Sequence, residues 1–75
     1  MTRTEALATI EAESLGTHAW FGFPENVTDR VAIYQTPDGW VVVNTDERAV
    51  QGAIQTFTDE DSALDLFVRR LRLYK

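Results

Sequence analysis

The chain has no cysteine, only one histidine and no long apolar run. Without cysteine, neither a disulfide nor a thiolate metal site can hold the fold, which fits a reducing compartment. Apolar runs such as Trp40–Val43 are far too short to span a bilayer. The first residues are polar and then amphipathic, unlike a secretion signal. We therefore expect a soluble cytoplasmic protein that has no membrane partner.

Basic residues are also scarce, except at the end of the chain. Residues 1–68 hold three arginines against twelve acids, a net charge of −9, and the last seven residues bring the total to −5. Nucleic-acid binding depends on clustered lysine and arginine, so we expect no nucleic-acid partner. An acidic surface favours a basic partner, whose approach it accelerates. The alternative is that the charge serves only solubility.

Seventy-five residues with 44% hydrophobic content predict one domain over residues 1–75. Thr2 and Glu5 have the spacing of a capping box, which predicts a helix over residues 2–15. Gly16 is expected to end that helix in the left-handed conformation.

The next residues predict a strand, then a two-stranded hairpin, then a further strand. Residues 17–23 are aromatic and bounded by a turn signal, which predicts a strand. Residues 30–44 predict a β-hairpin around Thr36-Pro37-Asp38-Gly39, with proline at the first central turn position and a positive φ at glycine. Residues 51–57 predict a fourth, weaker strand.

Thr58 is the expected N-cap of a second helix, with acids 59–61 in its first turn and arginines in its last. The resulting fold class is α+β. We expect two layers, an antiparallel meander sheet of three to four strands with the N-terminal and C-terminal helices packed on one face. The other face would be open to water or to a partner.

Residues that could support catalysis are few. His18 is the only histidine, and the nearby serine, Ser14, lacks a strained turn to present it. Acids 59–61 with Asp65 resemble a cation site only in composition, because consecutive residues on a helical turn point in different directions. We therefore predict no enzyme activity, no cofactor and no metal.

Binding residues are easier to suggest. Strand alternation prevents every aromatic from facing the helices, so Trp20, Tyr34 and Trp40 either complete the core or serve as surface anchors. The predicted partner-binding residues are two of these aromatics and four loop acids: Tyr34, Trp40, Glu25, Asp29, Asp46 and Glu47.

One pattern extends over residues 30–71. Trp40–Val43 forms a Trp-x-Val strand, Glu47-Arg48 follows in a polar turn, and Phe57 precedes an acidic helix start that contains Ala63. This pattern resembles a family of small bacterial immunity proteins from polymorphic toxin systems.

The resemblance implies a cytoplasmic inhibitor that binds and neutralises a cognate protein toxin, often an enzyme with a basic cleft. The chain departs from the family pattern at Ala49, where members tend to have glycine. Two alternatives remain open: an acidic inhibitor of a host nucleic-acid enzyme encoded by a phage or mobile element, and a structural module that forms a homodimer through its sheet.

Overall fold

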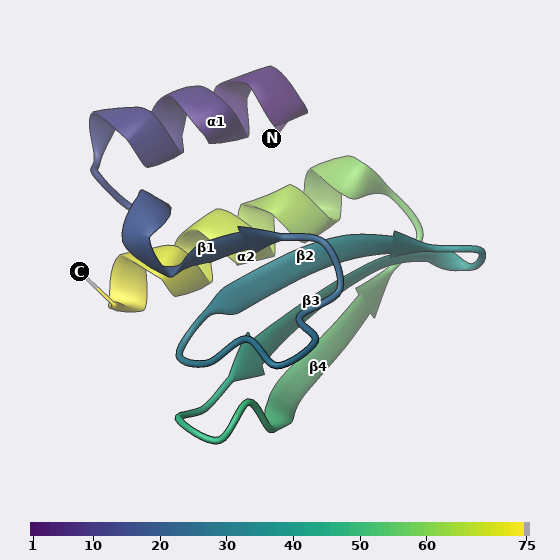
Figure 1. Cartoon of the computed structure of the whole chain (residues 1–75). Helices are drawn as coiled ribbons and strands as arrows, with labels where there is room; N and C mark the ends of the chain where they lie inside the picture. The colour runs from purple at the N-terminus through teal and green to yellow at the C-terminus, as the bar shows by residue number, and fades with distance from the viewer. Residues whose placement is uncertain (75) are drawn as a thin grey trace.

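The computed structural model describes residues 1–74 and contains two helices, a short 3-10 turn and one four-stranded sheet (Figure 1). The strand order is β1-β2-β3-β4. The predicted α+β class is therefore confirmed. The elements are α1 (Arg3–Ala12), η1 (Gly16–His18), β1 (Ala19–Phe21), β2 (Val31–Thr36), β3 (Gly39–Thr45), β4 (Gln51–Phe57) and α2 (Glu60–Leu73).

The sheet is mixed, which corrects the predicted antiparallel meander. β2, β3 and β4 pair antiparallel, but β1 pairs parallel to β2, with Ala19 opposite Val31 and Phe21 opposite Ile33. Residues 22–30, which we call the crossover segment, return the chain from the end of β1 to the start of β2. A return to the same end makes the two strands parallel. The predicted strand over residues 17–23 shrinks to three residues.

One face of the sheet packs against the helices and forms the main core. Val31, Ile33 and Val42 share a buried cluster with Phe67 of α2 and Ile10 of α1. Helix α2 lies against β2, β3 and β4, while α1 packs mainly on α2. Burying each such side chain stabilises the fold by roughly 1.5–3 kcal/mol. The placement of both helices on one side of the sheet is confirmed.

The opposite face is covered over β2 and β3, so the expectation of an open face is wrong there. Ala32, Val41 and Val43 are buried in a second cluster, against which Tyr34 packs. The crossover segment passes over these strands (Figure 1) and contributes Pro24, which is fully buried. A polar loop covers the face because the parallel connection must cross the sheet.

Both helix starts are capped by side chains. Thr2 and Glu5 form the predicted capping box, which confirms that element. The N-cap of α2 is Asp59, whose carboxylate accepts from the N–H of Ser62 at 2.8 Å, and not Thr58 as predicted. Helix α1 ends at Ala12, and Ser14 (φ 57°) takes the left-handed conformation expected of Gly16.

The turn that joins β3 to β4 is built on a hydrogen-bonded aspartate. The N–H of Ala49 donates to the carbonyl oxygen of Asp46 at 3.1 Å, and Ala49 has a φ of 62°. A type I turn followed by a left-handed residue is a standard three-residue hairpin loop, and glycine is favoured at the left-handed position. This position is the one where the immunity proteins tend to have glycine.

Candidate binding groove

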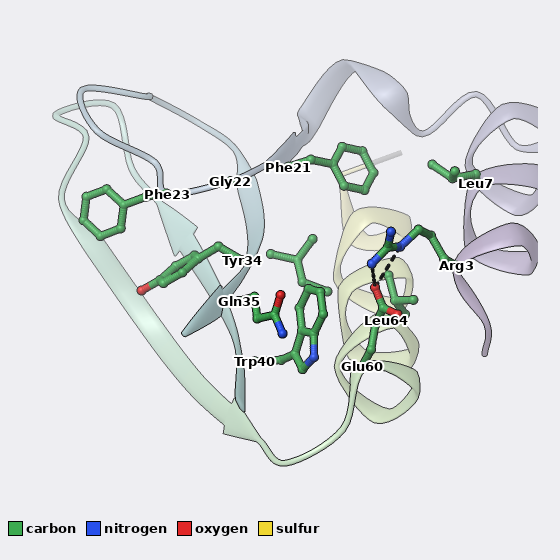
Figure 2. Close-up of a pocket in the computed structure, with 11 residues that line it drawn as sticks. Arg3, Leu7, Phe21, Gly22, Phe23, Tyr34, Gln35, Trp40, Glu60 and Leu64 are labelled. Atoms are coloured by element: carbon green, nitrogen blue, oxygen red, sulfur yellow. Dashed lines mark hydrogen bonds and ion pairs between the residues drawn. The ribbon is translucent and has the colours of Figure 1, made fainter. Parts of the chain in front are cut away.

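An apolar groove of about 610 Å³ lies where β1 stops and the outer edge of β2 continues (Figure 2). Its volume falls within the range of ligand and peptide pockets. Residues from both helices, β1, β2, β3 and the start of the crossover segment line it. They are Arg3, Leu7, Phe21, Gly22, Phe23, Ile33, Tyr34, Gln35, Trp40, Glu60 and Leu64.

Three large apolar side chains of the groove are about half exposed: Leu7, Phe21 and Phe23. The ring of Phe21 meets the buried ring of Phe67 edge-on, with centroids 5.3 Å apart. The ring of Phe23 meets Tyr34 in the same way at 5.4 Å. These contacts fix the two phenylalanines in place while leaving much of their surface in water. Exposed apolar surface concentrated in a groove is typical of a binding site.

The polar part of the groove is an ion pair between the two helices. The Arg3 guanidinium donates twice to one carboxylate oxygen of Glu60, from Nε at 2.9 Å and from Nη2 at 2.6 Å. Arg3 is largely exposed and Glu60 is partly covered. In water such a pair contributes little to stability, but it links the start of α1 to the start of α2 beside the groove.

Tyr34 and Trp40, the two predicted anchors, both line the groove and are both half-buried. Tyr34 is paired with Val41, and Trp40 with Gln35, so the two rings belong to opposite faces of the sheet. Tyr34 packs with the cluster under the crossover segment and Trp40 with the helix cluster. The structure thus gives each ring a core contact and a groove surface.

The four predicted acids lie in two loops, and three of them are at the other end of the sheet. Glu25 and Asp29 lie in the crossover segment, Asp46 and Glu47 in the β3–β4 turn, and all four are exposed. The N–H of Asp29 donates to the carbonyl oxygen of Asp46 at 3.1 Å, which joins the two loops. We call Asp29, Asp46 and Glu47 the acidic end, which is separated from the groove by the length of β2. Glu25 lies nearer the groove, because its N–H donates to the carbonyl oxygen of the groove residue Phe23 at 3.0 Å.

Asp46 also has a structural role. One oxygen of its carboxylate accepts from the N–H of Arg48 at 2.8 Å and from the N–H of Val50 at 2.9 Å. Both donors are main-chain groups of the turn, so this side chain shapes the loop that presents Glu47. Asp46 therefore supports the acidic end whether or not it contacts a partner.

Several groove residues lay outside the sequence prediction. Leu7 lies three positions before Ile10, a helical spacing that predicts a buried residue, but its side chain lines the groove because α1 contacts α2 through Ala6 and Ile10. Phe21 and Phe23 fall within the strand predicted over residues 17–23, for which the sequence does not indicate the buried face. The sequence does contain one signal for this site, a glycine between two phenylalanines. In the structure, Gly22 has a φ of 128° and turns the chain out of the sheet between Phe21 and Phe23.

The carboxylates at the start of α2 are occupied by other contacts. Asp59 caps the helix, and its hydrogen bond from the Ser62 N–H lowers its pKa. Glu60 binds Arg3, and Asp65 lies 2.9 Å from the amino group of Met1. Within residues 1–74, no three histidine, aspartate or glutamate side chains gather as a metal site would require.

His18 stacks on Tyr74 at the C-terminal end of α2, with ring centroids 4.6 Å apart. This contact ties the 3-10 turn to the helix. Close by, Arg72 makes a two-pronged ion pair with Glu13, at 2.9 and 2.7 Å, which raises the pKa of the arginine. Arg70 donates to the side-chain oxygen of Asn44 at 2.9 Å. Two of the three arginines in the last turns of α2 thus bind neighbouring elements.

Comparisons of the chain with protein-family models, curated proteins and solved structures find no match. The resemblance to immunity proteins therefore rests on the residues of the 30–71 pattern alone. No helix within residues 1–74 is both long enough and apolar enough to cross a membrane.

Proposed function

We propose that this protein is an inhibitor of the immunity-protein type, which binds and neutralises a cognate bacterial toxin. The observation that carries the proposal is the apolar groove, in which aromatic and aliphatic side chains stay half exposed on an otherwise acidic chain. Aromatic anchors in a groove supply binding energy, while surrounding charge supplies speed and selectivity of association.

The acidic end gives the second half of the argument. The molecule measures 30 × 30 × 15 Å. A standard protein interface covers about 800 Å² on each partner, so one interface can reach from the groove to the acidic end. A toxin with a basic substrate cleft suits this surface, because the acids attract the cleft and the aromatics hold it.

Co-expression tests the proposal directly. The genes beside the gene for this protein are searched for one that encodes a toxin-like protein, its product is expressed in cells with and without this protein, and survival and co-purification are measured. We expect protection and a stable complex. Growth arrest in both cultures, with no complex on purification, would rule out the proposed function.

Charge reversal then tests the role of the predicted loop acids. A triple variant with lysine at positions 25, 29 and 47 should slow association with the toxin by about tenfold or more at low salt, with less effect at high salt. Asp46 is left unchanged because its carboxylate holds the turn. Equal association rates for both proteins would show that these acids do not steer binding.

A further inference from the structure

We propose that the groove receives an extended, basic and apolar segment of the partner protein, which adds to the sheet beside β2 where β1 stops. The inference rests on the proposed function, because the segment belongs to the protein that is inhibited. It deepens that function by naming the kind of segment and its position.

The main chain of β2 supplies the first argument. The N–H of Thr45 donates to the carbonyl of Arg30 at 2.8 Å, so alternate residues onward from Arg30 face β3 and the others face β1. On the β1 side, the carbonyl of Ile33 accepts from the N–H of Gly22 at 2.9 Å. Gly22 then turns the chain away.

The next outward-facing residue of β2 is Gln35. Its N–H and C=O groups point toward the groove, and they have no main-chain partner within residues 1–74. An extended segment offers the matching donor and acceptor at this spacing, whereas a helix uses its main-chain groups internally. The occupant that fits this edge is therefore a strand.

Side chains supply the second argument. A strand places successive side chains on opposite faces. On one side of a strand in the groove, they would meet Leu7, Leu64 and Trp40, and on the other side Phe23 and Tyr34 (Figure 2). Both walls are apolar, so apolar residues on either face of the incoming strand bury surface. The open length of β2, residues 34–36, accommodates a short segment.

Charge complementarity indicates the sign of the charge that the partner segment should carry. Gly39 approaches Phe57 and Thr58, which brings the tip of the hairpin next to the start of α2. The charged residues that line the groove are Arg3 and Glu60, and three further acids lie within two residues of its lining in sequence: Asp38, Asp59 and Asp61. The arginine is already held by Glu60. A segment with lysine or arginine is favoured, and a second copy of this chain, itself at −5, is disfavoured.

A peptide titration tests the inference without the toxin. The probe is a ten-residue peptide of alternating valine and lysine, acetylated and amidated, added to the full isotope-labelled protein and followed by NMR. We expect saturable shifts of the Gly22 and Gln35 amides and of the Trp40 indole. Two control peptides have the same sequence but carry methyl groups on the main-chain nitrogens of every second residue, one peptide for each of the two alternate sets. Both keep the charge, but only one loses the N–H groups that would face β2. That peptide should bind about tenfold more weakly.

Two proline variants complete the experiment. Gln35→Pro removes the outward N–H of β2 without touching the bonds to β3, and should weaken peptide binding about tenfold. Thr56→Pro removes an outward N–H from the opposite edge of the sheet, on β4, and should leave binding within about twofold.

The inference is overturned if shifts appear only at the acidic end, if neither of the two methylated peptides binds more weakly, or if no saturation is reached. It is equally overturned if both proline variants bind as the unchanged protein does. Because no toxin is present, these failures would leave the inhibition measured by co-expression standing. Conversely, loss of protection in cells would remove the proposed function without altering the peptide result.

Discussion

The two edges of the sheet meet the same physical problem in different ways. An edge strand carries unpaired main-chain groups that can pair with another chain. At the β4 edge, residues 52–56 are all exposed, their side chains are mostly small or polar, and a bulge at Ala53 (φ 52°) shifts the register opposite Val43. At the β2 edge, the open stretch is short, regular and walled by apolar side chains.

A bulge interrupts the regular spacing that a pairing strand needs, and polar side chains remove the gain from burying surface. The β4 edge therefore has both common protections against unwanted pairing. The β2 edge has neither, except for its short length. From this contrast we learn which edge the molecule leaves available, and the following predictions test it.

Gly39 lies at the tip of the β2–β3 hairpin and packs against the end of β4, so changing it should have the largest effect. A Cβ at this residue would lie 2.2 Å from the carbonyl oxygen of Phe57, and its φ of 144° disfavours other residues. Gly39→Ala should lower the free energy of unfolding by about 2–4 kcal/mol, measured by chemical denaturation. Gly52→Ala, where nothing lies within 4 Å, is the matched control with an expected change of about 0.5 kcal/mol or less. Similar losses for both would contradict the account of the hairpin.

Two apolar side chains, one at each edge of the sheet, are exposed to a similar extent, so substituting them compares the contribution of each edge to binding. Phe23 is 57% exposed beside the groove and Ile54 is 59% exposed on β4. Phe23→Ser should weaken inhibition of the toxin, or binding of the alternating peptide, by about tenfold, which corresponds to about 1.4 kcal/mol. Ile54→Ser should change either by about twofold at most. The comparison of edges fails if Ile54→Ser has the larger effect.

The turn that leads into β4 should be improvable. Ala49 occupies a left-handed conformation that costs an alanine about 1–2 kcal/mol, and glycine recovers part of this after its own entropy cost. Ala49→Gly should raise the free energy of unfolding by about 0.5–1 kcal/mol, measured by chemical denaturation. Ala8→Gly, in the middle of α1, should lower it by about 1 kcal/mol. If Ala49→Gly is destabilising too, the left-handed turn is not strained.

Acid should weaken the groove side of the molecule through its helix caps. The pKa of Asp59 lies below its ordinary value of 3.8, because the Ser62 N–H donates to the ionised form. The stabilisation is therefore present above about pH 4 and is lost as the pH falls through the folded-state value. Asp59→Asn keeps a capping oxygen without a titrating group. Its stability relative to the unchanged protein should rise as the pH is lowered from 6 to 3, and a constant difference would exclude the cap as the cause.

Local signals predicted local structure well. The capping box of Thr2 and Glu5 and the turn at Thr36–Gly39 depend on side-chain and main-chain chemistry within four residues, and both are present. Asp29 precedes β2 and Asp46 follows β3, and the Asp29 N–H joins the two loops by donating to the carbonyl oxygen of Asp46.

The parallel placement of β1 was missed because strand orientation depends on the path of the crossover segment, which no short pattern records. The groove was missed for the same reason. Phe21 and Leu7 are ordinary apolar residues in sequence, and they become groove walls only because β1 stops after three residues. The point at which a strand ends therefore determines which side chains of the neighbouring elements remain exposed.

The crossover segment begins at the groove with Gly22 and Phe23 and reaches the acidic end at Asp29, and it is fixed near its start by the buried ring of Pro24. It adds no strand to the sheet and no turn to either helix. New sequences on either side of Pro24 would therefore change both the apolar and the charged halves of the surface while the scaffold stays the same. For the inhibitor that we propose, changes confined to these nine residues would alter the surface that it presents to its target.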